Sequence, residues 1–391
     1  MLSVFKIAKK IIFISIISPL SIYYFFYLIL NRKIFKNKYI FVSNLSSFGH
    51  QCIAYYTLNF LKKKNENVSV IEILCSRNNS NLSYFFNKLD KFFLYSSNHS
   101  RINIYVGKYI YRVLKFLTKN KNNKILNYND ILKIKKKEFL QKKDYFVKFY
   151  WYPSNKVTKS YENFYWLDLM LKKNKLDCNI EPDLFKEIKK KYNFKKKIAS
   201  ICFRSVFNID KYDQLRVFNP NNYDAGIKWL LRNNYTIINH NREFNKFFKQ
   251  YKEVINLSDI IHGNSNFDFL NLLIIAKSNK VITQHSGIHI FPALFGIETI
   301  MCDVFPFCSG STGDKNILLF KNCLYKGNKI NIKKIHKHEK FFYGKVGKNY
   351  NILDNTDQQI LAAIKSKNKI KINYPKESLI GYRKNWIVNY E

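Results

Sequence analysis

Residues 198–303 alternate between strand-like and helix-like runs, and this alternation limits the fold more than any other feature of the sequence. The β-prone runs are 198–203, 235–239, 254–257, 280–283 and 298–303. The helix-like runs between them are 220–232, 243–250, 267–277 and 287–295. Strands joined by helices pair in parallel through right-handed crossovers. The pattern predicts a doubly wound, Rossmann-like α/β domain.

A shorter alternation of the same kind stands near the N-terminus. Residues 38–43 and 68–74 are strand-like, and a helix-like stretch ending at about Lys64 lies between them. A Lys-dense stretch at 186–197 is typical of a surface between domains, and we place the boundary there. The predicted organisation is listed in chain order as an apolar segment 1–36, a Rossmann-like domain 37–190, a second one 191–365 and a basic tail 366–391.

The apolar segment contains twenty consecutive uncharged residues, 11–30, between basic flanks. This length is enough for a helix to cross the hydrocarbon core of a membrane. Pro19 and three serines interrupt the run, so a helix lying at the membrane interface is a second interpretation, and an apolar helix packed on the protein is a third. The basic flanks favour contact with anionic lipid, with the two domains on the cytoplasmic side.

The net charge of +40, from 67 basic and 27 acidic residues, indicates a polyanionic or phosphorylated partner. Nucleic acid is not predicted, because no helix-turn-helix or RNA-binding pattern is present. The seven cysteines form no C-x-x-C pair, and His336-x-His338 has no cysteine at ligand spacing. We therefore predict neither a metal site nor a cofactor.

In open α/β sheets, ligands bind outside the carboxyl ends of the strands. After the first strand come Ser47, Gly49 and His50. Gly49 permits a tight turn, and an imidazole at His50 could accept a proton from a hydroxyl group near neutral pH. His50 could equally be a packing or capping residue.

The second domain has basic residues at two strand ends. Arg204 follows the strand 198–203, and Arg216 lies in the loop after it. His240 and Arg242 follow the strand 235–239. Arginine is rare in this chain, with nine residues, and its planar fork suits a diphosphate.

The third candidate is His285-Ser286-Gly287, between the strand 280–283 and the helix 287–295. Backbone N–H groups at a helix N-terminus attract anions, so a phosphate could dock there. The alternative is a Ser-Gly helix cap that binds no ligand.

Several short motifs, taken in order, resemble a family of glycosyltransferases encoded among bacterial surface-polysaccharide genes. They are Ile201-Cys202-Phe203-Arg204, Trp229–Ile238, Ile282–Gly287, Pro292-x-x-Phe295-Gly296 and Leu353–Thr356. Cys202 stands where the family usually has histidine, and Asn234-Tyr235 replaces its Gly-Tyr. The Ser-Gly turn also resembles the phosphate turn of the heptosyltransferase-like group.

The resemblance implies the GT-B architecture, in which two Rossmann-like domains face a cleft, here with an added N-terminal apolar helix. It implies a metal-independent transferase, with the acceptor on 37–190 and the nucleotide-sugar on 191–365. Arg204 and His50 would be catalytic, beside donor contacts from Arg216, His240, Arg242 and the 285–287 turn. The acceptor would be a lipid-linked glycan or a surface polysaccharide.

Three other interpretations stay open at this point. A nucleotide-sugar epimerase or hydrolase on the same fold would consume donor without an acceptor. A basic protein without catalysis would bind membranes or nucleic acid through its charge alone. A chain that has kept the fold but lost the chemistry would have the substitutions seen at 202 and 234.

Overall fold

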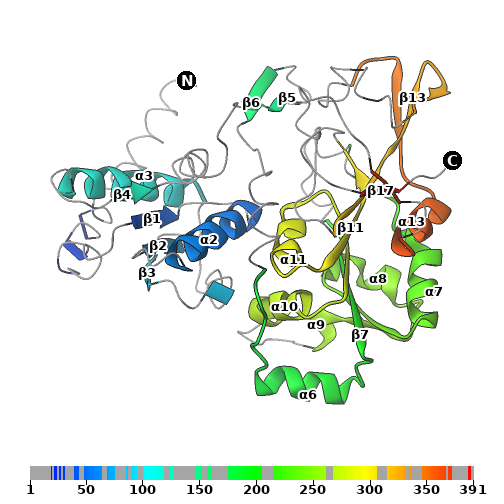
Figure 1. Cartoon of the computed structure of the whole chain (residues 1–391), viewed down its shortest axis with the longest axis horizontal. Helices are drawn as coiled ribbons and strands as arrows, with labels where there is room; N and C mark the ends of the chain where they lie inside the picture. The colour runs from blue at the N-terminus through cyan, green and yellow to red at the C-terminus, as the bar shows by residue number, and fades with distance from the viewer. Residues whose placement is uncertain are drawn as a thin grey trace, which may run out of the picture. The chain divides into compact units, whose positions relative to one another are not determined.

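The computed structural model describes the chain in segments. They are residues 19, 22–23, 26–27, 30, 39–43, 48–63, 68–74, 85–86, 90–95, 100–118, 124–126, 147–151, 156–160, 175–204, 215, 217–260, 267–305, 315–331, 335, 338, 346–366, 369–371 and 386–388. The chain forms two compact units, Met1–Gln141 and Lys142–Glu391. Each unit is described by itself (Figure 1).

The first unit contains a parallel four-stranded sheet in the order β3-β2-β1-β4. Its strands are β1 (Tyr39–Ser43), β2 (Val68–Leu74), β3 (Asp90–Tyr95) and β4 (Lys124–Leu126). Helix α2 (Phe48–Lys63) joins β1 to β2, and α3 (Ser100–Leu117) joins β3 to β4. The predicted strand–helix–strand opening is confirmed, and the chain crosses back after β3 to place β4 on the other side of β1.

The core of this unit lies between α3 and the sheet. Ile40 and Val42 alternate along β1 and meet Val106, Ile110 and Leu114 of α3. The three α3 residues are four apart and therefore share one helix face. Helix α2 is buried along Cys52–Asn59, more completely than an amphipathic surface helix would be.

The second unit is built on an eight-stranded sheet in the order β16-β17-β12-β11-β10-β7-β8-β9. Neighbouring strands pair in parallel except β16 and β17. The strands are β7 (Lys197–Cys202), β8 (Tyr235–Asn239), β9 (Val254–Asn256), β10 (Lys280–Gln284), β11 (Glu298–Val304), β12 (Ile317–Phe320), β16 (Lys369–Lys371) and β17 (Trp386–Val388). The chain runs outward from β7 to β9 and then crosses to β10, so the order reverses between β7 and β10.

Helices connect these strands as the alternation predicts. They are α6 (Asp183–Lys191), η4 (Pro220–Tyr223), α7 (Asp224–Arg232), η5 (Arg242–Phe244), α8 (Asn245–Phe248), α9 (Leu257–Ile260), α10 (Phe267–Ala276), η6 (Gly287–His289), α11 (Ile290–Leu294) and α13 (Asp357–Ile364). The predicted cap at Asn219 is confirmed, since its side chain accepts from the Asn221 N–H. Three predicted helices, 220–232, 243–250 and 287–295, begin as 3₁₀ turns.

Two small antiparallel sheets complete the second unit. One pairs β5 (Val147–Trp151) with β6 (Lys156–Ser160). The other has the order β14-β13-β15, formed by β13 (Asn322–Tyr325), β14 (Asn328–Lys329) and β15 (Tyr350–Leu353). Since β13 follows β12 after one residue, this sheet continues from the carboxyl edge of the large sheet (Figure 1).

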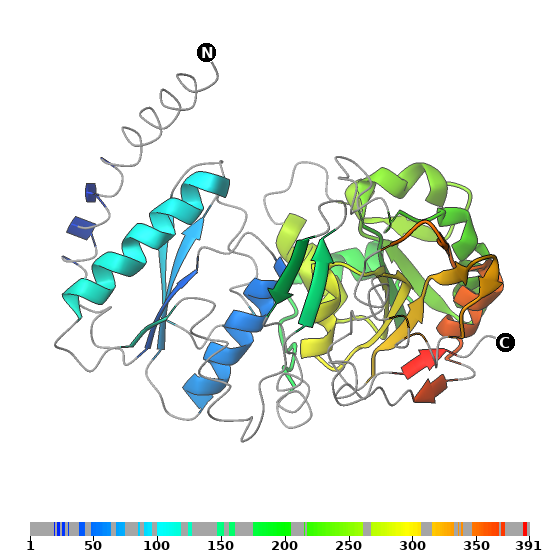
Figure 2. The same ribbon diagram turned by 90° about the horizontal axis from the view of Figure 1, so that it is seen from above.

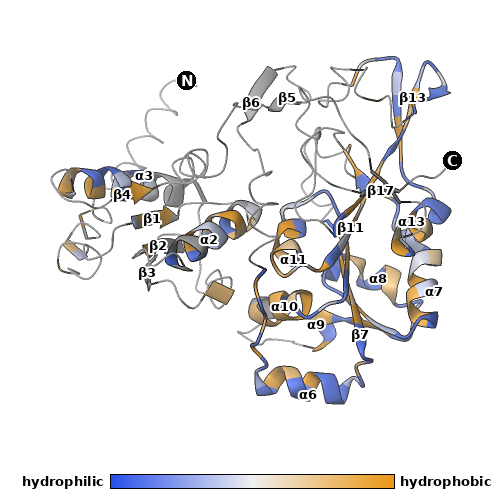
Figure 3. Ribbon diagram, viewed as in Figure 1, coloured by the Kyte–Doolittle hydropathy of each residue, from blue (hydrophilic) through white to orange (hydrophobic). Residues whose placement is uncertain are grey.

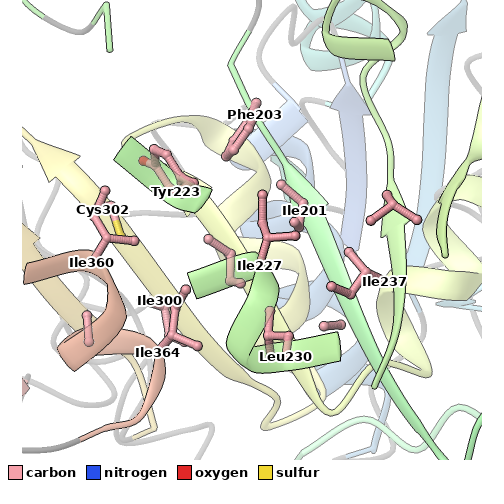
Figure 4. Close-up of a cluster of buried hydrophobic side chains, with 14 of the residues drawn as sticks. Ile201, Phe203, Tyr223, Ile227, Leu230, Ile237, Ile300, Cys302, Ile360 and Ile364 are labelled. Carbon is pink, nitrogen blue, oxygen red and sulfur yellow. The ribbon is translucent and has the colours of Figure 1, made fainter. Parts of the chain in front are cut away.

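The main core of the second unit is apolar and lies where α7 and α13 cover one face of the sheet. Figure 4 shows Ile227 and Leu230 of α7 between the strand residues Ile201 and Ile237 and the α13 residue Ile364. The buried strands are correspondingly hydrophobic in Figure 3. Burial on this scale supplies the main free energy that holds the helices to the sheet.

The boundaries of the units differ from the predicted ones at two places. The second unit begins at Lys142 rather than 191, and the Leu176 N–H donates to the Leu294 carbonyl at 2.8 Å, which ties residues before α6 to this unit. The predicted tail 366–391 contributes β16 and β17, and β17 pairs in parallel with β12.

The predicted apolar segment 1–36 falls mostly outside the described residues. Those that are described, among them Ile22, Tyr23, Phe26 and Leu30, are helical. Within the part of the chain that the structure describes, no helix has both the length and the apolar character needed to cross a bilayer.

Gly226 of α7 packs against Ile364 of α13. A Cβ at this position would lie 2.3 Å from Cδ1 of Ile364. We expect Gly226→Ala to lower the free energy of unfolding by about 1–3 kcal/mol through overpacking. Ile364→Val alone should cost about 0.5–1.5 kcal/mol, because it leaves a small void.

The double variant Gly226→Ala/Ile364→Val tests whether this contact is the cause. Valine lacks the Cδ1 atom, so the double variant should lose less than the sum of the two single losses. Denaturant unfolding of the four proteins measures this coupling. Strictly additive losses would show that the two positions do not meet.

Candidate functional site

The candidate site lies at the carboxyl ends of β7 and β10, where the strand order reverses. Thr283 of β10 pairs with Cys202 of β7, and the Thr283 hydroxyl donates to the Cys202 carbonyl at 2.8 Å. After β7 the chain continues into Phe203-Arg204, and after β10 it continues into His285-Ser286-Gly287. Such a reversal is the usual ligand-binding position of a doubly wound sheet.

Arg204 and the turn after β10 are joined by two hydrogen bonds. The Arg204 backbone N–H donates to Oε1 of Gln284 at 2.7 Å. A guanidinium N–H of Arg204 donates to the His285 carbonyl at 3.3 Å. The structure therefore brings together two site segments that the sequence separates by eighty residues, and the Arg204 side chain remains half-buried at the edge of the sheet.

The backbone position of Arg204 is fixed by the packing of its neighbour Phe203 in the core. The Phe203 ring packs against four other aromatic rings, with centroid distances of 4.9 Å to Phe218, 4.7 Å to Tyr223, 5.1 Å to Phe244 and 5.8 Å to Phe248. Figure 4 shows Phe203 beside Tyr223 at the end of β7. Since aromatic packing of this kind is rigid, the backbone leaves the core at Arg204 in one direction.

The turn after β10 is tighter than predicted. Ser286 has an extended backbone, and Gly287–His289 form a 3₁₀ turn before the five-residue helix α11. The His289 Nδ1 contacts the Ser286 carbonyl, while the His285 Nδ1 lies 3.1 Å from the Phe305 carbonyl. The dipole of so short a helix is small, so an anion here would depend on the first N–H groups of the turn and on Arg204.

A buried hydrogen-bond chain supports Gln284 from within the fold. Gln284 Nε2 donates to the Tyr223 hydroxyl at 3.0 Å, and this hydroxyl donates to Oδ2 of Asp303 at 3.1 Å. The backbone N–H of Asn355 donates to Oδ1 of Asp303 at 2.7 Å, and the Asp303 N–H donates to the Asn355 side chain at 2.7 Å. The sequence motifs included Gln284 and Asn355 but gave them no role, and they omitted Asp303.

Burial also changes the titration of the Asp303 carboxyl group in this chain of contacts. Burial raises the pKa of Asp303 to about 6, although Lys321 and the Asn355 N–H act in the opposite direction. Lys321 is itself buried, and it forms an ion pair with Asp354 and donates to the Val217 carbonyl at 2.6 Å. A polar residue at the carboxyl end of an apolar strand was the available sequence signal for both Gln284 and Asp303.

His240 is held inside the second unit. Its Nε2 lies 2.8 Å from Ser200 Oγ, and its Nδ1 contacts the Asn271 side chain on α10. Burial lowers the pKa of His240 to about 4, with the Asn271 contact opposing the change. The ring is therefore neutral at pH 7 and connects β7, β8 and α10, so its predicted donor contact would require one of these bonds to open.

The other predicted residues are distributed as follows. Arg242 is exposed in η5, beyond the end of β8. Gly49 is buried in the first turn of α2, so α2 begins before Gln51, and His50 lies in the same turn at the carboxyl end of β1. The side chain of His50, together with Ser47 and Arg216, lies outside the described residues.

Metal-ligating side chains do not cluster in the described part of the chain: no group of three or more His, Cys, Asp or Glu residues is positioned to hold an ion there. His338 packs against Tyr325 and Tyr350, with its Nδ1 at 3.2 Å from the Tyr350 hydroxyl. His336 falls outside the described residues.

These features define a class of protein, a chain with two Rossmann-like α/β units. In the second unit the strands β9-β8-β7-β10-β11-β12 follow the order 3-2-1-4-5-6 of the doubly wound Rossmann sheet. No protein-family model matches the chain, and no curated protein matches it in sequence.

Solved structures align with most of its length. A glycosyl transferase of family 9 from Veillonella parvula aligns with 12% identity and a TM-score of 0.48, covering 84% of this chain and 96% of its own. The ADP-heptose lipopolysaccharide heptosyltransferase II of E. coli has 10% identity and a TM-score of 0.42, with 78% and 98% covered. A Listeria monocytogenes protein described as a UDP-N-acetylglucosamine 2-epimerase has 11% identity and a TM-score of 0.37, with 68% and 78% covered.

The predicted resemblance was to surface-polysaccharide glycosyltransferases and, more distantly, to the heptosyltransferase-like group. A glycosyl transferase of family 9 and two heptosyltransferases are among the solved structures that align. All three TM-scores are below 0.5. These alignments therefore carry no conclusion about the function.

The raised pKa of Asp303 gives a test of the buried chain. The pKa of Asp303 is higher in the folded than in the unfolded chain. Its contribution to the free energy of unfolding is therefore fully present below about pH 4 and is lost as the pH rises through 6. Relative to Asp303→Asn, the unmodified protein should lose roughly 2–3 kcal/mol of stability between about pH 4 and pH 7.

Asparagine suits this position, because Asp303 has a φ of 52° and asparagine tolerates the left-handed region. Denaturant unfolding of both proteins across this pH range measures the difference. Two parallel stability curves would contradict a raised pKa at Asp303.

Proposed function

We propose that this protein is a glycosyltransferase that binds the diphosphate of a nucleotide-sugar at the switch point of its second unit. The observation that carries the proposal is the meeting of Arg204 with the 285–287 turn between β7 and β10, joined by the 2.7 Å bond to Gln284. A permanent cation and a turn of backbone N–H groups together match a diphosphate.

The charge that develops during the transfer explains why these groups matter. The bond between the anomeric carbon and the phosphate oxygen breaks, and the departing nucleoside diphosphate takes the electron pair. A fixed guanidinium stabilises this charge without reorganising, because the Gln284 bond and the Phe203 packing already hold the Arg204 backbone. In this proposal side chains supply the positive charge and no metal ion is required.

The acceptor hydroxyl forms the new bond to the anomeric carbon and loses a proton. We assign that proton to the imidazole of His50, which follows β1 in the first turn of α2. Arg216, His240 and Arg242 are assigned to the nucleotide part of the donor, and Ser47 and Gly49 to the acceptor side. A glycan or glycolipid acceptor is the choice that the sequence resemblance supports.

Arg204→Ala is the central test. Loss of one such charge-stabilising donor should lower the rate of transfer by about 10²–10³-fold while the fold remains intact. The transfer rate of Arg204→Lys should lie between those of the unmodified protein and of Arg204→Ala, because lysine keeps the charge but loses the planar fork. Arg232→Ala is the matched control, since Arg232 is exposed at the end of α7 and its side chain donates to the Lys228 carbonyl of the same helix.

The assay begins with a thermal-shift screen against UDP-, GDP-, CMP- and dTDP-sugars, with and without a chelator. A donor at about 100 times its dissociation constant should add about 2.7 kcal/mol of stability. Transfer is then measured with the donor that binds. Unchanged turnover in Arg204→Ala would remove this residue from the mechanism, and donor consumption without any acceptor would favour an epimerase or hydrolase.

A further inference from the structure

Large apolar side chains are exposed on the N-terminal segment of the first unit. The exposed fractions are 53% for Ile22, 62% for Tyr23, 57% for Phe26 and 81% for Leu30. Residues 22, 26 and 30 are four apart and therefore share a helix face. Tyr27 is half-buried and packs against the core of the unit. The segment is thus oriented, with one apolar face outward.

Helix α3 presents a second exposed face on the same unit. Its exposed residues are Lys108, Tyr109, Arg112, Lys115 and Phe116, and the exposed fraction of Phe116 is 77%. At 3.6 residues per turn they occupy about a third of the helix circumference. This face combines three cations with two aromatic rings and has no acidic residue.

The two faces flank the same core. Tyr27 of the N-terminal segment and Tyr111 of α3 both pack against the cluster between α3 and the sheet. Figure 2 shows α3 lying beside the strands of this unit. The Lys115 ammonium lies 4.8 Å from the centre of the Tyr111 ring. The N-terminal segment and α3 therefore contact the same core of the first unit, and each has exposed side chains of its own.

Exposed apolar residues rimmed by charge mark an interaction site, and the charge identifies the partner. Anionic lipid headgroups attract lysine and arginine near a bilayer, while aromatic and aliphatic side chains enter the boundary between headgroups and acyl chains. The uncharged run 11–30 and its basic flanks continue the same pattern along the sequence.

We propose that the exposed face of α3 and the exposed side chains of Ile22, Tyr23, Phe26 and Leu30 form one docking surface for an anionic lipid membrane. The surface goes beyond the proposed transfer reaction and does not depend on it, because its residues belong to the first unit and the donor residues to the second. It holds the protein at the bilayer through contacts from two elements rather than through the N-terminal segment alone.

The test measures partition of the full-length chain onto vesicles of phosphatidylcholine with about one quarter phosphatidylglycerol, and onto phosphatidylcholine alone. Each basic residue near the surface contributes about a fivefold factor, so Lys108→Gln/Arg112→Gln/Lys115→Gln should lower binding to the anionic vesicles about a hundredfold. Phe116→Ser should lower binding to both vesicles, by about tenfold.

The matched control removes the same charge elsewhere. Lys190, Lys191 and Lys196 are exposed in the second unit, and their replacement by glutamine should change binding less than about threefold. An equal loss in both triple variants would show that net charge alone binds the vesicles and would overturn the proposal. Thermal unfolding verifies that each variant is folded.

Three further results would also overturn it. One is a full-length chain that does not bind anionic vesicles. Another is binding that disappears when residues 1–38 are removed and is unaffected by the α3 substitutions, which would assign attachment to the N-terminal segment alone. The third is a dimer that Phe116→Ser dissociates, without vesicle binding, which would assign the surface to a second copy of the chain. Donor-induced thermal shifts, measured on the same variants, report on the proposed reaction separately.

Discussion

The side chain of Gln284 is the contact on which the candidate site depends. Its oxygen accepts from the backbone of Arg204, and its nitrogen donates to Tyr223, so one amide joins the surface of the switch point to the buried Asp303 and Asn355. A buried amide is costly unless both of its ends are bonded. Because both ends are satisfied here, the loop after β7 and the strand β10 are held in one relative position.

The same constraint explains how distant parts of the chain support the site. The residues at the start of α13 are bonded to η4 and α7. The Asn219 N–H, which precedes η4, donates to Asp354 at 2.9 Å, and the Ala225 N–H of α7 donates to Asp357 at 2.8 Å. Thr356 and Gln359 form a reciprocal cap on α13. The apolar contacts of α7 and α13 hold the layer together, and these polar contacts fix its register on the sheet.

Much of this fold could be predicted from the sequence, because hydrophobic periodicity is a local signal. The strands 235–239 and 280–283 and the cap at Asn219 were predicted from neighbouring residues alone, and the structure has them within a residue or so. The tail strands β16 and β17 were not predicted, since three-residue strands in a Lys-rich stretch carry almost no periodic signal. The candidate site divides in the same way, since Arg204 and the Ser-Gly turn were predicted from their places at strand ends. The bond from Arg204 to Gln284 spans 80 residues, and the bond from Asn355 to Asp303 spans 52. Contacts between residues so far apart give no signal in the local sequence pattern.

The close packing of α7 on α13 at Gly226 has a consequence for the motions of the second unit. Two helices that share one core and one set of capping bonds open together, so their amide protons should exchange with solvent at a common rate that reflects a single cooperative unit. The Asp303–Asn355 bonds connect that unit to the switch point. Occupation of the switch point by a ligand would therefore slow exchange in α13, a helix that contributes no side chain to the site.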